Sequence, residues 1–170
     1  TLPASTSAAL SMAFSLDPFK KVSTSEIAQW LSKAKADYLA VYDVGQGNSN
    51  ALLGADGSCR YAVPTLYYDL GKGVGRNSGT TPGSLEFCFT KVPDIVLSHW
   101  DSDHWAGACI PNSSGSYPAL ALRWIAPNQK VGTSHIVFAH DVIANSGKLY
   151  IYSASPGTVV VACLSDHRQI

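Results

Sequence analysis

Charge is scarce in this chain, and neither sign prevails. Only 14% of the 170 residues are charged, and 12 basic residues balance 12 acidic ones, so that the formal net charge at pH 7 is zero. A protein that attracts a polyanion over its whole surface carries an excess of Lys and Arg. The composition therefore excludes a strongly basic nucleic-acid-binding protein, and a small anionic partner fits the charge balance as well as a long one.

Long apolar runs and paired cysteines are missing too. No apolar stretch approaches the roughly 20 residues that a membrane-spanning helix needs, so we expect no membrane contact and a cytoplasmic location. The four cysteines are scattered without a Cys-x-x-Cys pair, which favours small buried side chains over a disulfide framework or a zinc knuckle. Hydrophobic residues make up 46% of the chain, enough for a folded domain with a real core.

Against this background, residues 98–104 concentrate polar side chains. The segment reads Ser-His-Trp-Asp-Ser-Asp-His, and it follows the apolar strand-like run 92–98. Imidazole with carboxylate is the ligand set of Zn²⁺, Mn²⁺ and non-haem iron, and it leaves a bound water free to react. We therefore predict a metal site formed by His99, Asp101, Asp103 and His104.

The spacing predicts how these side chains point. In an extended segment alternate side chains share one side, so His99, Asp101 and Asp103 are expected to converge, with His104 aimed at a neighbouring point. Such a loop would serve two adjacent metal ions. Asp103 is also a candidate N-cap for a helix that begins near Trp105. The alternative is a polar strand-to-helix turn with solvated histidines.

The segment resembles a known signature. The pattern His-x-[His/Asp]-x-Asp-His after a buried strand is similar to that of the metallo-β-lactamase superfamily, and the form with Asp in the third position most resembles the hydrolase domain of ComEC-type DNA-uptake proteins. Residues 41–48 resemble the Asp-Val-Gly-Gln-Gly-Asp segment of that subfamily, with Asn48 in place of the final Asp, and residues 66–71 resemble its strand ending in Asp-x-Gly. These matches span residues 38–110 in the family's order.

The resemblance implies a fold and a reaction. The fold is α/β, a metallo-β-lactamase-like αββα arrangement with a layered mixed sheet, and the site holds two divalent metal ions, Zn²⁺ or Mn²⁺. The reaction is metal-dependent hydrolysis of a phosphodiester in a nucleic acid or nucleotide, with Asp103 also acting as a catalytic residue that steers the nucleophile. The family's second half supplies a bridging Asp and a further His, for which residues 38–170 show no counterpart. We therefore expect the first half of the fold only, with an incomplete site.

Two upstream aspartates end strand-like runs. Asp43 follows the run 38–42, and Asp69 follows a third extended region that Pro64 is expected to interrupt. Between them, residues 51–54 form a returning strand, with a hairpin turn at 55–58. We predict that Asp43 and Asp69 orient metal ligands rather than bind metal. The alternative is that each bonds its own turn.

The two ends of the chain carry further elements. Residues 1–37 form an N-terminal segment with a capped amphipathic helix over 25–36, expected to cover the sheet or to contact another protein. Downstream strands are predicted at 120–125, 134–139, 149–152 and 158–162. The remaining histidines, His135, His140 and His167, are interpreted as packing residues outside the site.

Two other functions remain open on the sequence. The chain would be a non-catalytic binding module of the same fold, or one part of a split enzyme completed by a second chain. The split enzyme predicts a large exposed apolar patch where the sheet lacks its complement.

Overall fold

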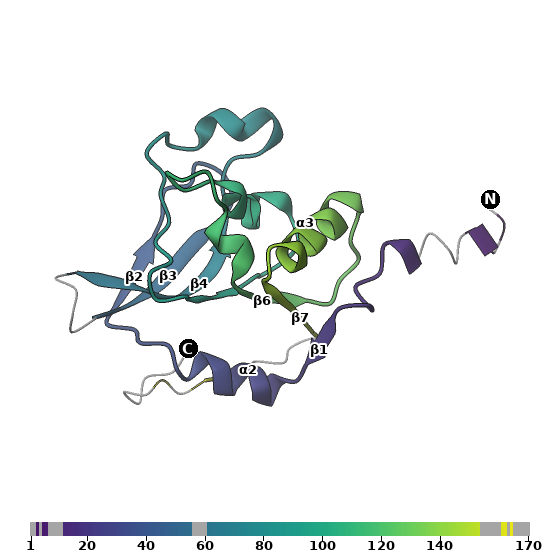
Figure 1. The fold of residues 1–170 in the computed structure, drawn as a ribbon, viewed down its shortest axis with the longest axis horizontal. Coiled ribbons are helices and arrows are strands. Elements are labelled where there is room, and N and C mark those ends of the chain that lie inside the picture. The colour runs from purple at the N-terminus through teal and green to yellow at the C-terminus, as the bar shows by residue number, and fades with distance from the viewer. Residues whose placement is uncertain are drawn as a thin grey trace.

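In the described part of the chain, a mixed sheet of seven strands forms the centre of the protein (Figure 1). The computed structural model describes residues 3, 5–6, 12–55, 61–153, 161–162 and 164. The strand order is β1-β7-β6-β5-β4-β3-β2. The strands are β1 (Lys20–Val22), β2 (Tyr38–Val41), β3 (Ser49–Ala55), β4 (Ala62–Leu70), β5 (Asp94–Val96), β6 (Arg123–Pro127) and β7 (Lys148–Tyr152).

Strand direction divides the sheet into two parts. The strands β1, β7, β6, β5 and β4 are parallel to their neighbours, whereas β3 and β2 continue the sheet antiparallel from β4. The carboxyl ends of β4 and β5 therefore lie together at one edge, beside the loop that connects β2 to β3. Polar residues that follow parallel strands gather at such an edge.

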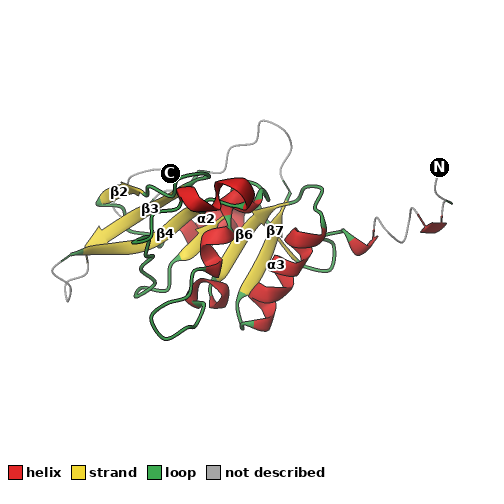
Figure 2. Ribbon diagram, turned by 90° about the horizontal axis from the view of Figure 1, so that it is seen from above, coloured by secondary structure: helices red, strands yellow, loops and turns green. Residues whose placement is uncertain are grey.

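Two α-helices cover opposite faces of the sheet (Figures 1 and 2). Helix α3 (Thr133–Ala144) buries Phe138 and Val142 in a cluster with Trp124 of β6. The next residue of β6, Ile125, points to the other face, where it packs against Ile27 of helix α2 (Thr24–Leu31). This alternation is the one that a strand buried on both faces requires. The N-terminal segment thus contributes the edge strand β1 to the sheet and the helix α2 to one of its faces.

The N-terminal helix is confirmed, with an earlier end. Ser23 Oγ accepts a hydrogen bond from the Glu26 backbone N–H, and the Glu26 carboxylate accepts one from the Ser23 N–H at 3.0 Å. This reciprocal pair is the capping box that the sequence Ser-x-x-Glu indicates. The helix ends at Leu31 rather than near Ala36, and the residues after it turn into the connection to β2.

The predicted strand at 134–139 is wrong. These residues lie in α3, whose buried side chains at 138, 139 and 142 follow the spacing of a helix. Short apolar runs do not distinguish a strand from a buried helix, and the β-branched pair Ile136-Val137 is typical of a strand. The strand predicted at 120–125 begins later, at Arg123, after a 3₁₀ turn at Pro118–Ala121.

Pro64 does not interrupt its strand. The strand β4 runs continuously through Pro64, which lies opposite Leu53 next to a shift in register between β3 and β4. A local irregularity of the ladder accommodates the missing N–H of proline. The strands predicted around 38–42, 51–54 and 149–152 are confirmed, whereas the turn at 56–58 and residues 158–160 fall outside the described part of the chain.

The cysteines differ from the expectation of buried side chains. Cys88 is half-buried and Cys109 is exposed, and both are free thiols. Cys59 and Cys163 fall outside the described residues. In the described segments, no helix has the length and apolar character to cross a membrane.

Candidate metal centre

The predicted site residues lie at the carboxyl edge of β4 and β5. Asp69 stands near the end of β4, and residues 98–104 follow β5 as a loop that ends in a 3₁₀ turn at Ser102–His104. Asn48 joins them from the loop that precedes β3. Two loops and the end of a strand, far apart in the sequence, therefore meet at one point.

Asp69 is the centre of this arrangement. Its side chain has no exposed surface, and its two oxygens accept four hydrogen bonds. The Ser98 backbone N–H donates to Oδ1 at 2.7 Å, whereas Ser98 Oγ, Asn48 Nδ2 and His104 Nδ1 surround Oδ2 at 2.7, 3.0 and 2.9 Å. A carboxylate can be buried only when such donors replace its water shell. Asp69 also has a φ of 59°, which Asp tolerates better than most residues.

These bonds select the tautomers of both histidines. His104 Nδ1 donates its proton to Asp69, which leaves the Nε2 lone pair of His104 available. Ser98 Oγ donates its proton to Asp69, so it accepts a hydrogen bond from His99 Nδ1 at 2.9 Å. In the neutral ring, a proton on Nδ1 leaves the Nε2 lone pair of His99 free. A ring fixed through one nitrogen to a carboxylate or hydroxyl is the usual state of a metal-ligating histidine.

His99 lies close to both His104 and Asp101. The two imidazole rings lie 3.9 Å apart between centroids, and His99 Nε2 lies 3.2 Å from Asp101 Oδ2. Two lone pairs at this distance repel unless a proton or a cation lies between them. A Zn²⁺ ion with N and O ligands at about 2.1 Å places two ligand atoms about 3.0–3.4 Å apart, so the pair fits a shared cation.

The predicted alternation along residues 99–104 is wrong. The 3₁₀ turn at Ser102–His104 breaks the extended backbone, so that Asp103 does not continue the row of His99 and Asp101. It does not cap an α-helix either, because a second 3₁₀ turn at Ala106–Cys109 follows. Within the residues that the structure describes, no group of three or more His, Cys, Asp or Glu side chains is arranged to hold a metal ion. The role of Asp103 as ligand and catalytic residue thus remains a prediction.

Two glycines lie in close contact with the main chain of Asp103. A Cβ on Gly47 would lie 1.8 Å from the Asp103 carbonyl oxygen, and one on Gly71 would lie 2.1 Å from the same atom. Gly47 also has a φ of +88°. Both segments that carry the upstream sequence matches therefore approach Asp103 so closely that only glycine fits.

Asp43 forms a contact of the alternative kind, within its own turn, and Asn48 makes a contact that the sequence did not predict. Asp43 is exposed and accepts a hydrogen bond from the Gly45 N–H at 3.1 Å, so its carboxylate organises its own turn. Asn48 is the residue that touches Asp69, and a carboxylate at this position would place a second negative charge beside a buried one. The amide supplies the donor that Asp69 needs.

Sequence reasoning missed Ser98, whereas His135 is a packing residue as predicted. Ser98 Oγ links Asp69 to His99, and only its position beside the motif pointed to it. His135, at the start of α3, lies beside Trp100 and Trp105, with ring centroids 6.2 and 6.4 Å away. Burial lowers the pKa of His135, and the nearby Asp101 carboxylate partly opposes this shift. Its Nδ1 accepts a hydrogen bond from the Gly132 N–H at 2.8 Å, so the ring is fixed there too.

Comparison with known proteins adds no relative. No protein-family model, curated protein or solved structure matches this chain. The candidate site is therefore defined by its own geometry.

Proposed function

We propose that this protein is a metal-dependent hydrolase that cleaves phosphodiester bonds, built as a metallo-β-lactamase-like fold. The observation that carries the proposal is the orientation of the two histidines. Asp69 and Ser98 each engage an Nδ1 atom, which leaves both Nε2 atoms available to a metal ion, and His99 Nε2 lies 3.2 Å from Asp101 Oδ2. A purely structural polar turn has no need of two histidines held in this tautomer.

The residues divide into those that hold the metal and those that orient them. His99 and Asp101 would hold one divalent ion and Asp103 and His104 a second one, and Asp103 would also steer the nucleophile. The ions, Zn²⁺ or Mn²⁺, would supply a hydroxide at neutral pH and stabilise the charge that develops on a phosphate. Asp69 holds the His104 ring in position and places a negative charge behind it, which makes His104 Nε2 a stronger metal ligand.

The ligand set favours phosphodiesters over other substrates. Asp101 occupies the third motif position, where a carboxylate makes the site more anionic and harder than a histidine would. Hard, oxygen-rich metal sites suit phosphate oxygens, which are hard ligands themselves. The neutral net charge fits a nucleotide or another small phosphodiester at least as well as long DNA.

Hydrolysis of bis(p-nitrophenyl) phosphate in the presence of Zn²⁺ or Mn²⁺ tests this function. We expect metal-dependent turnover, and we expect His104→Gln to lower kcat/KM by about 100-fold because one ligand and its link to Asp69 disappear. The matched control is His140→Gln, which removes an exposed histidine of α3 that packs on Phe19. Equal rates in the two variants, or turnover in a chelator, would rule the proposal out.

A second candidate, one part of a split enzyme, is favoured by an exposed apolar face. Leu39 and Val41 of the edge strand β2 are 67% and 74% exposed, and Tyr68 of β4 is 48% exposed. Leu39 and Tyr68 line one shallow depression together with Leu52 and Leu66. Exposed apolar surface of this kind is typical of an interface. Metal binding without hydrolysis by the isolated chain would favour this candidate or a non-catalytic module.

A further inference from the structure

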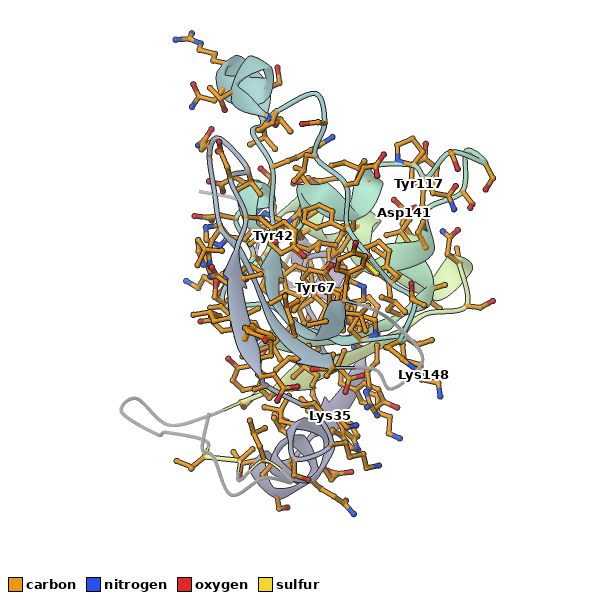
Figure 3. The ribbon with its side chains drawn as sticks, turned by 90° about the vertical axis from the view of Figure 1, so that its left-hand side faces the viewer. Lys35, Tyr42, Tyr67, Tyr117, Asp141 and Lys148 are labelled. Atoms are coloured by element: carbon orange, nitrogen blue, oxygen red, sulfur yellow. The ribbon has the colours of Figure 1, made fainter. Side chains whose placement is uncertain are left out.

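A second polar site lies at the opposite edge of the sheet. A cavity of about 350 Å³ opens beside the amino ends of β5 and β6, on the face that α2 covers. Figure 3 shows Lys35 on this side of the sheet, next to α2, with Tyr42 and Tyr67 farther from that helix. The candidate metal centre lies at the carboxyl ends of the same strands, so the two sites are separate.

Basic side chains from three different elements line this cavity. Lys33 and Lys35 come from the connection between α2 and β2, Lys91 from the loop before β5, and Arg123 from the start of β6. Among the described residues that line the cavity, Asp94 is the one acidic side chain. In a chain with zero net charge, this concentration of positive charge is local and specific.

The single carboxylate is already neutralised. Arg123 donates from Nε to Asp94 Oδ1 at 2.7 Å and from Nη2 to Oδ2 at 2.6 Å, and its guanidinium lies 4.4 Å from the centroid of the Trp30 ring. This bidentate pair forms a rigid wall of the cavity. In the described part of the chain, no ion pair involves Lys33 or Lys35.

The backbone around these lysines is fixed. Thr65 Oγ1 donates to the Lys35 carbonyl oxygen at 2.6 Å, and the Lys35 side chain packs on Gly54, where a Cβ would lie 2.5 Å from that of Lys35. Val92, next to Lys91, has a φ of 49° although it is β-branched and 69% exposed. Residues held in such a conformation persist only where the surroundings impose it, and they concentrate at binding sites.

We propose that this cavity binds a multiply charged phosphate anion, such as a diphosphate group. Lysine ammonium groups act as point charges toward phosphate, and Lys33 and Lys35 line a space of the size of a small-ligand pocket. A diphosphate matches their combined charge better than a single carboxylate does. The inference does not depend on the metal centre.

Isothermal titration calorimetry with inorganic pyrophosphate, on the full chain freed of metal on a chelating resin, tests this inference. We expect saturable binding that weakens as salt increases. The double variant Lys33→Gln/Lys35→Gln is expected to bind about 10-fold more weakly or worse, because two exposed charges that face the anion are lost. Lys130→Gln, which removes one exposed charge from the loop between β6 and α3, is the control and keeps its affinity.

A second measurement locates the anion. Pyrophosphate is expected to shift the Trp30 indole N–H resonance in an NMR titration of the wild-type chain, since this ring lines the cavity. Absence of saturable binding would overturn the inference. So would equal affinity in the lysine double variant, or a Trp30 resonance that does not move while heat is released.

Discussion

Asp69→Asn is expected to lower the free energy of unfolding by about 3 kcal/mol or more, because it replaces a fully buried acceptor of four hydrogen bonds. An amide offers one oxygen and one NH₂ group. Whichever way it is turned, at least one donor among Ser98, Asn48 and His104 faces another donor. Asn tolerates the left-handed backbone of this position, so the substitution tests the charge and not the φ of 59°.

The same variant is expected to weaken metal binding by about 10- to 100-fold, since the His104 ring loses the carboxylate that orients it. Chemical denaturation and a metal titration measure the two effects. Asp43→Asn makes the identical chemical change at an exposed turn, where the amide oxygen still accepts from the Gly45 N–H. We expect a change below about 0.5 kcal/mol there. Similar losses in both variants would show that Asp69 does not organise the site.

Gly47→Ala is the second change with a large expected effect. The added Cβ would lie 1.8 Å from the Asp103 carbonyl oxygen, so one of the two loops must move. The left-handed backbone adds a cost of about 1–2 kcal/mol for a residue with a Cβ, and overpacking adds about 1–3 kcal/mol. We expect a total loss of about 3 kcal/mol in the free energy of unfolding, with reduced metal affinity because residues 103 and 104 are displaced.

Gly75→Ala separates the two causes. Gly75 also has a positive φ, +56°, but a Cβ there meets nothing within 4 Å. Thermal or denaturant unfolding should show a loss of only about 1 kcal/mol for this variant, with metal affinity unchanged. If the two alanine variants lose the same stability, the close approach of the loops at Asp103 is not a constraint on this fold.

Local patterns predicted those parts of the fold that depend on local physics. The capping box at Ser23 and Glu26, the apolar strand before residue 98 and the placement of Asp69 near a strand end follow from neighbouring residues alone. The helix α3 did not, because its apolar residues 136–139 satisfy a strand pattern equally well and only packing against β6 decides.

The sequence indicates which residue types belong to the candidate site, but not how their side chains contact one another. Four potential metal ligands in six positions predict metal chemistry, yet the backbone turn at Ser102–His104 separates Asp103 from the row that alternation predicted. The contacts of Asp69 with Asn48 and Ser98 depend on how the end of β4 lies relative to two loops that are distant in the sequence. No spacing rule within one segment contains that information.

The most direct test of the central claim is the metal content per chain after gel filtration, measured by elemental mass spectrometry for the wild type, His99→Gln and His140→Gln. We expect about one or two divalent ions per wild-type chain. The ions are expected to be retained in His140→Gln and lost in His99→Gln, because the wild-type His99 Nε2 lies 3.2 Å from Asp101 Oδ2. Equal metal content in the three proteins, or none in the wild type after incubation with Zn²⁺ and Mn²⁺, would contradict a metal centre at this edge of the sheet.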